Sequence, residues 1–302
     1  MKSKKIIIGS RGSKLALIYA ERARRKLFEF CSNVEIKKIT TTGDKNQKDR
    51  LSEIGGKGLF SKQIENDLLD KKIDIAVHAL KDMPSFETEG LLTNCFLERN
   101  DPREVLVSNN NILIKDLKPN SIVGTSSFRR EFQLKKFRND INFKLIRGNV
   151  DTRIKKLNEK LYDAIILSYA GIKSLNLDKN ISQIFSLKEI IPSVGQGVVA
   201  LQCRKNDTDI IKVLDKINHQ PTKICVVAER QLLKILEGDC ETAVGGIAKL
   251  ENENITLEAE LFSFDGKKRF YHSASKNISL ANELGIEVGE ILKKDSKNSY
   301  KR

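Results

Sequence analysis

Short β-branched runs alternate with amphipathic segments over the first two-thirds of the chain. Residues 6–8 form an apolar run that predicts a first strand. Apolar residues then recur at the spacing of one helix face, which predicts a helix over 13–30, and residues 34–40 predict a second strand. Strands that alternate with helices in this way are typical of an α/β fold.

A long polar stretch interrupts this alternation at residues 41–58, with the sequence TTGDKNQKDRLSEIGGKG. A loop of this length inside a compact domain is usually functional, and we expect it to be a mobile lid. A helix over 59–69 and a strand over 73–77 follow, and the end of this strand carries the segment HALKDMP.

A second unit begins near Asp101, with strands predicted at 122–123, 143–146 and 164–167 and helices at 127–137 and 152–157. The order strand, glycine, hydroxyl residues, helix occurs in both IIIGSRGSKLAL and SIVGTSSFRREF, which is a faint internal repeat. Hydroxyls and free N–H groups at a helix N-terminus form an anion site, although ordinary N-capping explains either segment alone. Two such ends in two similar lobes favour a cleft lined for anions at the carboxyl ends of the strands.

The pattern changes after the turn SVGQG at residues 193–197. The strand that follows is expected to cross back into the first lobe. A helix over 223–236, strands near 247 and over 255–262 and 269–272, and a closing helix over 281–293 predict a separate small α+β domain. The predicted domains are therefore lobe 1 (1–99 plus about 198–218), lobe 2 (100–197) and a C-terminal domain (219–302).

Net charge narrows the function classes only slightly. The 302 residues include 54 basic and 40 acidic side chains, a net charge of +14, which nucleic-acid binding, small anionic substrates or compositional bias would each explain. The sequence has no basic stripe interleaved with aromatics and no zinc-finger or helix-turn-helix spacing, so we expect no nucleic-acid partner. No apolar run approaches the roughly 18 to 20 residues of a membrane helix, and the first run is too short for a signal peptide. We therefore expect a cytoplasmic protein with no membrane partner.

Cys240 differs from the other four cysteines, which are Cys31, Cys95, Cys203 and Cys225. The five form no CxxC pair and are widely spaced, so neither a metal site nor a disulfide framework is predicted. Cys240 lies in a turn immediately after a predicted helix, where reactive or modified cysteines are found.

The positions of the arginines indicate anionic ligands. Arg11 lies at the first strand-to-helix turn, Arg129 and Arg130 lie in the first turn of the helix after GTSS, and Arg147 and Arg153 bracket another such turn. Cations at helix N-termini are mildly unfavourable, whereas a planar guanidinium suits bidentate binding of a carboxylate. Structural pairing with nearby acids explains any one of these arginines but not the whole set.

HALKDMP places His78, Lys81 and Asp82 directly after an apolar strand. A carboxylate beside a cation stays ionised, which suits a group that stabilises developing positive charge or handles a proton. The same segment is also consistent with an ordinary turn before Pro84, and a packed histidine is the simpler explanation of His78.

Seven segments identify a family: IGSRGSKLAL, GGKGLF at residues 55–60, HALKDMP, GTSSFRR, LIRGNVDTR, PSVGQG and AERQLLKILEGDC. In their order and spacing, from Ile8 to about Gly245, the chain resembles the porphobilinogen deaminases, or hydroxymethylbilane synthases. The resemblance implies two α/β lobes similar to periplasmic binding proteins and a small C-terminal α+β domain. It further implies a monomeric transferase that joins four porphobilinogen molecules head to tail, with loss of ammonia, to give hydroxymethylbilane for haem biosynthesis.

The resemblance also implies roles for individual residues. Cys240 would carry a dipyrromethane cofactor through a thioether, and Asp82 would be the catalytic aspartate that steers the proton and stabilises the cation formed when ammonia leaves. Further cofactor contacts are expected from Lys81, Ser127, Arg129 and Arg130. Substrate contacts are expected from Arg11, Ser13, Phe60, Thr125, Arg147, Arg153 and Gln196.

The sequence departs from the family pattern at three positions. Ala79 stands where the family usually has Ser, Ser174 where it has Arg, and Asp239 where it has Gly. We expect these changes to alter rate or affinity rather than abolish activity. A two-lobed protein that binds an organic anion without chemistry is one alternative, as is an inactive relative. A basic nucleic-acid-binding protein is another, and its affinity would fall steeply with salt.

Overall fold

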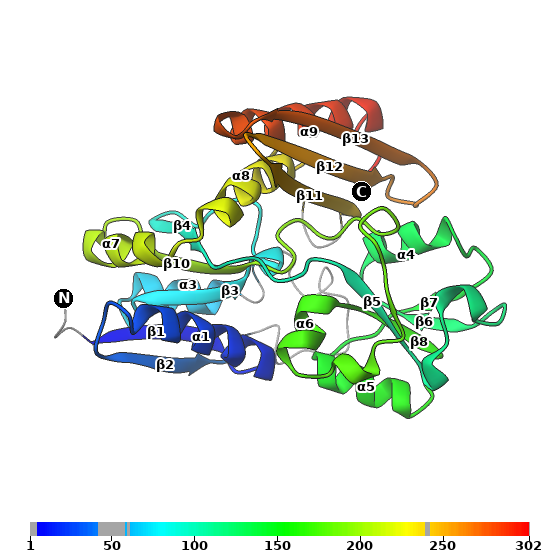
Figure 1. The fold of residues 1–302 in the computed structure, drawn as a ribbon, viewed down its shortest axis with the longest axis horizontal. Helices are drawn as coiled ribbons and strands as arrows, with labels where there is room; N and C mark the ends of the chain where they lie inside the picture. The colour runs from blue at the N-terminus through cyan, green and yellow to red at the C-terminus, as the bar shows by residue number, and fades with distance from the viewer. Residues whose placement is uncertain (1–4, 42–57, 59–60, 239–241, 302) are drawn as a thin grey trace. The chain divides into compact units, whose positions relative to one another are not determined.

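The computed structural model of the protein describes residues 5–41, 58, 61–238 and 242–301 (Figure 1). The chain divides into two compact units, one made of residues 1–100 and 197–226 and the other of residues 101–196 and 227–302. Within the described residues, none of the helices combines the length and apolarity that a bilayer crossing requires. The predicted lid, residues 41–58, lies almost wholly outside the described residues.

The first unit is built on a five-stranded sheet in the order β2-β1-β3-β10-β4. The first three of these strands in that order run parallel, and β10 is antiparallel to both β3 and β4. The strands are β1 (Ile6–Arg11), β2 (Val34–Ile39), β3 (Ile75–Ala79), β4 (Leu91–Phe96) and β10 (Val199–Arg204). The strand predicted after the SVGQG turn is β10, and it lies inside this first sheet.

Both faces of this sheet are covered, which explains why its inner strands β1, β3 and β10 are largely buried on both sides. Ile6 and Ile8 share a core with α1 (Lys14–Leu27) and α7 (Thr208–Ile217). Ile7 points to the opposite face and packs with the core that includes residues of α3 (Lys62–Leu69). The alternation of side chains along β1 therefore places one helix layer on each face.

The second unit contains a sheet of similar design, in the order β7-β6-β8-β5-β9. Here too three neighbouring strands are parallel and the fourth, β5, is antiparallel to the strands on both sides of it. The strands are β5 (Glu104–Ser108), β6 (Ile122–Gly124), β7 (Asn142–Lys144), β8 (Ala164–Ser168) and β9 (Gln183–Ile184), and the helices are α4 (Phe128–Lys135), α5 (Val150–Asn158) and α6 (Tyr169–Ser174). The segments of the faint sequence repeat are β1–α1 and β6–α4, and β1 and β6 are each second in their sheet.

The C-terminal part of the second unit is an antiparallel sheet, β11-β12-β13, with helices packed against it. Its strands are β11 (Val244–Glu251), β12 (Asn254–Phe262) and β13 (Arg269–Asn277), and α9 (Ala281–Ser296) packs against them. The helix α8 (Gln220–Ile235) begins in the first unit and continues into the second from residue 227. Short 3-10 turns complete the fold: η2 (Leu80–Asp82), η3 (Asn109–Asn111), η4 (Ile114–Asp116), η5 (Asp178–Asn180) and η6 (Ile278–Leu280).

Predicted and observed elements differ mainly at their ends and in short pieces. The strand predicted over 73–77 is β3, which begins two residues later and continues to Ala79. The helix predicted over 127–137 is α4, which begins after Ser127 because that residue is the N-cap. The pattern did not predict β4, β5, β9, α6 or α7, of which the strands are short or mix polar with apolar residues.

Gly197 allows two connecting segments to lie against each other. Its carbonyl accepts hydrogen bonds from the backbone N–H of Asn100 at 2.9 Å and from the Asn100 side chain at 3.1 Å. The φ angle of Gly197 is +83°, and a Cβ at this position would lie 2.3 Å from the Asn100 carbonyl oxygen. Both the dihedral and the close approach therefore require glycine.

We predict that Gly197→Ala destabilises the protein by about 3 kcal/mol, since a side chain there meets both backbone strain and a carbonyl that cannot move away. Gly12→Ala is the control, because a Cβ at Gly12 has no neighbour within 4 Å. Its free energy of unfolding should change by less than about 1 kcal/mol. Urea unfolding of both variants measures the difference, and equal midpoints would contradict the assignment.

Candidate functional site

In the first unit, expected site residues surround a small cavity at the carboxyl ends of β1 and β3. Arg11 ends β1, Ser13 caps α1 and Asp82 ends η2 just after β3. All three line a cavity of about 50 Å³, together with His78 and Ser61. Because the carboxyl ends of parallel strands meet at one edge, residues 70 positions apart in sequence come together there.

The turn that carries Asp82 is rigidly held. Leu80 and Met83, on either side of Lys81 and Asp82, are buried in an apolar cluster with Val198 and Phe96. The N–H of Leu80 also donates to the Val198 carbonyl at 3.0 Å. Lys81 is half-buried and Asp82 is exposed. The carboxylate is therefore presented to solvent from a backbone that packing fixes.

His78 is buried on β3, beneath this turn. It is 7% exposed, and its Nε2 has no hydrogen-bond partner among the described residues. Desolvation by burial lowers the pKa of His78 and outweighs the opposing effect of the buried Glu65 carboxylate. Glu65 in turn accepts a hydrogen bond from Gln202 Nε2 at 3.2 Å. The imidazole is thus neutral near pH 7, in agreement with the sequence-based view of a packed histidine.

The hydroxyl residues of the two repeat segments cap their helices. Ser13 Oγ accepts the N–H of Ala16 at 3.3 Å, and Ser127 Oγ accepts the N–H of Arg130 at 3.4 Å. Thr125 Oγ1 accepts the N–H of Ser127 at 3.1 Å. The two serines are therefore helix caps in the structure, whereas Thr125 stabilises the turn that leads into α4.

Arg129 and Arg130, in the second unit, are held by a residue that the sequence analysis missed. Arg129 Nη2 lies 2.5 Å from Glu104 Oε1, and Arg130 Nη2 lies 2.8 Å from Glu104 Oε2. Glu104 is fully buried, and the two arginines are 4% and 7% exposed. The only sequence signal was an acidic residue that opens an apolar strand, in the segment PREVLV.

Backbone carbonyls complete the arginine pair. Arg129 Nη1 donates to the Ile191 carbonyl at 2.9 Å, and Arg130 Nη1 donates to the Ile166 carbonyl at 3.1 Å. Burial and the neighbouring Arg130 lower the pKa of Arg129, against the effect of Glu104, with burial the largest cause. Two guanidinium groups share the Glu104 carboxylate, so these three residues carry one net positive charge. The Glu260 carboxylate of β12, which pairs with Lys136 and Arg269, also acts on Arg129.

Three further residues expected to bind substrate lie in the second unit: Arg147, Arg153 and Gln196. Arg153 Nε donates to the Gly148 carbonyl at 2.8 Å, and Arg147 is 8% exposed. Gln196 is fully buried and donates from Nε2 to the Pro102 carbonyl at 2.7 Å, a contact that joins two connecting segments. Ser174, where the family usually has Arg, donates its hydroxyl to the Ala170 carbonyl at 2.7 Å.

Cys240 and Phe60 lie outside the described residues. The strand that follows Cys240, however, begins close to the arginine pair. Ala243 packs in one apolar cluster with Phe132 of α4, which lies three residues after Arg129. A Cβ on Gly245 would lie 2.8 Å from the Ile191 carbonyl, the same carbonyl that accepts from Arg129. The segment after Cys240 and the arginine pair therefore share neighbours within the second unit.

The four described cysteines are all buried: Cys31, Cys95, Cys203 and Cys225. Burial raises the pKa of Cys31, that of Cys95 to about 12 and that of Cys203 to about 11. Thiols in this environment are poor nucleophiles.

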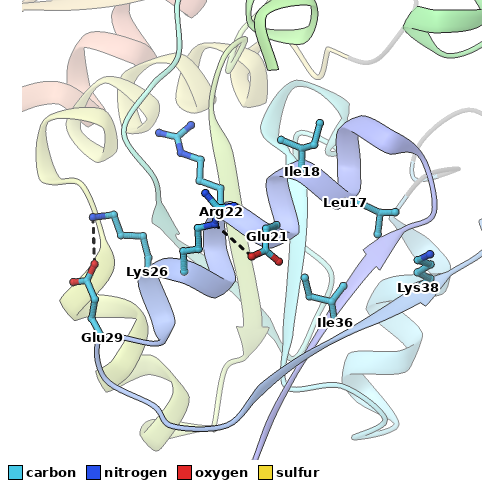
Figure 2. A pocket seen from close by; sticks show the side chains of 9 residues that line it. Leu17, Ile18, Glu21, Arg22, Lys26, Glu29, Ile36 and Lys38 are labelled. Carbon is cyan, nitrogen blue, oxygen red and sulfur yellow. Dashed lines mark hydrogen bonds and ion pairs between the residues drawn. The ribbon is translucent and has the colours of Figure 1, made fainter. Parts of the chain in front are cut away.

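A second hollow, on the outer face of α1, has no comparable chemistry. This groove of about 740 Å³ lies between α1 and β2 and is lined by Leu17, Ile18 and Ile36 and by charged residues, including Glu29 after α1 and Lys38 of β2 (Figure 2). Its charged side chains pair with one another, as Lys26 does with Glu29 at 3.6 Å and Arg25 with Glu21 at 3.4 Å. Surface pairs of this kind are typical of a solvated helix face.

Comparisons with known proteins match nearly the whole chain. Residues 6–212 match the family model "Porphobilinogen deaminase, dipyromethane cofactor binding domain", and residues 223–294 match "Porphobilinogen deaminase, C-terminal domain". A porphobilinogen deaminase of Staphylococcus epidermidis is 40% identical over 295 residues, covering 96% of this chain and 95% of the relative. One of Syntrophomonas wolfei is 42% identical and covers 94% of each chain. Among solved structures, the Bordetella pertussis BvgS periplasmic VFT2 domain has a TM-score of 0.40 at 12% identity and covers 70% of this chain and 85% of that one.

We predict that His78 makes the protein less stable in mild acid. Its pKa is lower in the fold than in the unfolded chain, so protons bind preferentially to the unfolded state below about pH 6.5. Through His78, the free energy of unfolding should therefore fall by up to about 1.4 kcal/mol for each pH unit below that value, down to the pKa that His78 has in the folded protein.

Urea unfolding between pH 7.5 and 5.5 tests this prediction, with both values chosen about one unit from the ordinary histidine pKa. His78→Gln should flatten the pH dependence, and His272→Gln, on the partly exposed strand β13, is the matched control for replacing a histidine elsewhere. Parallel pH profiles for His78→Gln and the unaltered protein would contradict the prediction.

Proposed function

The chain belongs to the porphobilinogen deaminase family of transferases, and from that premise we propose that it condenses four porphobilinogen molecules head to tail, with loss of ammonia, into hydroxymethylbilane. One observation carries the proposal for this chain's own residues. A buried pair of arginines with excess positive charge shares neighbours with the segment that follows Cys240.

That arrangement fits a bound dipyrromethane attached to Cys240. The cofactor would present carboxylates, and burying an unpaired carboxylate costs several kcal/mol. Arg129 and Arg130 offer the charge to compensate one such group, and each guanidinium has five N–H donors, of which two are used in the contacts described above. When bound, the dipyrromethane supplies the pyrrole end on which the product chain is built.

Cys240 is also favoured by the state of the other thiols. Each of the four described cysteines is buried, and the three with a raised pKa are unsuited to nucleophilic attack or attachment of a large group. A cofactor attached at Cys240 would keep each condensation on the enzyme, so the growing chain is held rather than recaptured at each step.

Asp82 is the residue we assign to the chemistry. Departure of ammonia leaves a positive charge on the substrate, and a carboxylate fixed beside that position stabilises the charge without having to reorganise. Asp82 is exposed on a turn whose flanking residues are buried, which suits this task. The same carboxylate oxygens are placed to accept hydrogen bonds from pyrrole N–H groups and to receive a proton.

The remaining polar residues are proposed to bind the acetate and propionate groups of substrate and cofactor. Each porphobilinogen adds two carboxylates, so the number of positive groups required grows with the product chain. Lys81 and Ser127 are assigned to the cofactor with the arginine pair. Arg11, Ser13, Thr125, Arg147, Arg153, Gln196 and Phe60 are assigned to the substrate.

We also propose three domains, with boundaries near residues 99, 197 and 219, and a monomer that works in the cytoplasm. The division between residues 100 and 101 and between 196 and 197 supports the first two boundaries, and the separate family match from residue 223 supports the third. The monomer rests on the family resemblance, and the cellular location is the expectation drawn from the sequence.

We predict that Asp82→Asn lowers the rate of porphyrin formation at least about 100-fold, because it removes the charge opposite the developing cation. The purified protein is incubated with porphobilinogen, then acidified and oxidised, and uroporphyrin absorbance is read. Asp116→Asn is a matched control, since Asp116 is also exposed and also ends a 3-10 turn. Equal losses in the two variants would contradict the assignment, and absence of porphyrin from the unaltered protein would leave an anion-binding relative.

We predict that Cys240 is blocked by a thioether in the purified protein. In urea, iodoacetamide should then label four of the five cysteines, and the folded protein should label slowly because its described thiols are buried. Intact mass should show a covalent adduct that Cys240→Ser abolishes and Cys31→Ser retains. Five labels in urea, with no adduct, would contradict the proposed attachment.

A further inference from the structure

Glu104 has no role in the proposed function described above, yet its buried carboxylate contacts both arginines of the proposed cofactor site. It opens β5, whereas Arg129 and Arg130 lie in the first turn of α4, about 25 residues later. One carboxylate oxygen faces each guanidinium, at 2.5 and 2.8 Å. A single rigid group therefore sets the spacing and the orientation of the pair.

The arginines alone would form an unfavourable pair. Two guanidinium groups at neighbouring positions of one helix turn repel each other, and burial weakens the screening of that repulsion. They also lie at a helix N-terminus, where cations are unfavourable. Glu104 offsets both effects by supplying one negative charge between them, and it leaves one positive charge in excess.

Part of the donor capacity of the cluster is not used by the protein. Arg130 Nε is buried and has no acceptor among the described residues. The fixed carbonyls of Ile191 and Ile166 take one N–H from each arginine and hold the guanidinium planes in place. The cluster is thus oriented on one side by the protein and retains charge for one further anion.

We propose that Glu104 is a positioning residue that holds Arg129 and Arg130 side by side and cancels one of their two charges, so that the pair accepts a single carboxylate of the bound pyrrole chain. The inference rests on the proposed function, because it takes the anion to be a carboxylate of cofactor or substrate. It extends that function by setting the charge of the site and by naming the residue that sets it.

Glu104→Gln tests the proposal because it keeps the size of the side chain and removes its charge. The amide oxygen of the new side chain accepts a hydrogen bond from one arginine, but its NH2 group repels the other, so the two guanidinium groups move apart. We therefore expect kcat/KM for porphobilinogen to fall about 100-fold. Glu104→Asp keeps the charge but shortens the side chain, so its kcat/KM should fall only about 3- to 10-fold, through a raised KM. Rates are measured on the full-length holoprotein, well below the melting temperature of each variant.

Asp74→Asn is the control for a carboxylate whose only role is to stabilise the fold. Asp74 holds Arg204 at 3.0 Å and is largely buried, but it directly precedes β3, belongs to the first unit rather than to that of the arginine pair, and does not line the cavity. This variant should lose stability and keep kcat/KM within about threefold, as expected for an independent site. Inorganic phosphate is added as a second probe. The phosphate concentration that halves the rate should be at least about fivefold lower for Glu104→Gln than for the unaltered protein, because the variant has one more uncompensated positive charge.

The outcomes separate the two proposals. If the unaltered protein makes no porphyrin, the proposed function fails. If it does, and Glu104→Gln matches Asp74→Asn in both kcat/KM and phosphate inhibition, the role of Glu104 is overturned. Should Glu104→Gln not fold, Glu104→Asp decides alone: a KM raised at least about threefold with kcat unchanged supports positioning, and an unchanged KM overturns it.

Discussion

A buried cation must be compensated, and in this protein the requirement is met at the N-terminus of α4 by one carboxylate between two guanidinium groups. Much of the second unit is arranged around this triad. Glu104 begins the antiparallel strand β5, Ile166 belongs to β8 beside it, and the Ile191 carbonyl comes from the segment between β9 and β10, which packs against Gly245 of β11. The sheet, the helix and this segment therefore share one polar cluster.

The five-stranded sheets of the two units present polar groups by the same arrangement. Each has three parallel strands, and each has a helix that begins directly after the second strand of its order with a serine as N-cap. The apolar interiors of the strands fix the backbone, so the polar residues just beyond the strand ends are held in place. Asp82 shows the consequence most clearly, since it is exposed between buried Leu80 and Met83.

Three features could be predicted from the sequence, because each depends on local pattern and chain order: the α/β alternation, the return of β10 to the first sheet and the position of Asp82 at a strand end. The sequence was insufficient for Glu104, whose partners are far along the chain and whose acidic side chain resembles any solvated residue before a strand. Gln196 was expected near the substrate, and its described contact with Pro102 could not be inferred from composition. Short strands such as β9, with two residues, carry too little pattern to be predicted.

The place of β10 in its sheet affects how the chain is made. This strand lies between β3 and β4, but it is synthesised after the whole of residues 101–196. A ribosome adds these about 100 residues in roughly 5–20 s, and during that time β3 and β4 face each other across a missing strand. Unpaired strand edges of this kind are sites of misassembly. The amino-terminal sheet must therefore wait, during translation, for a strand encoded beyond the second lobe.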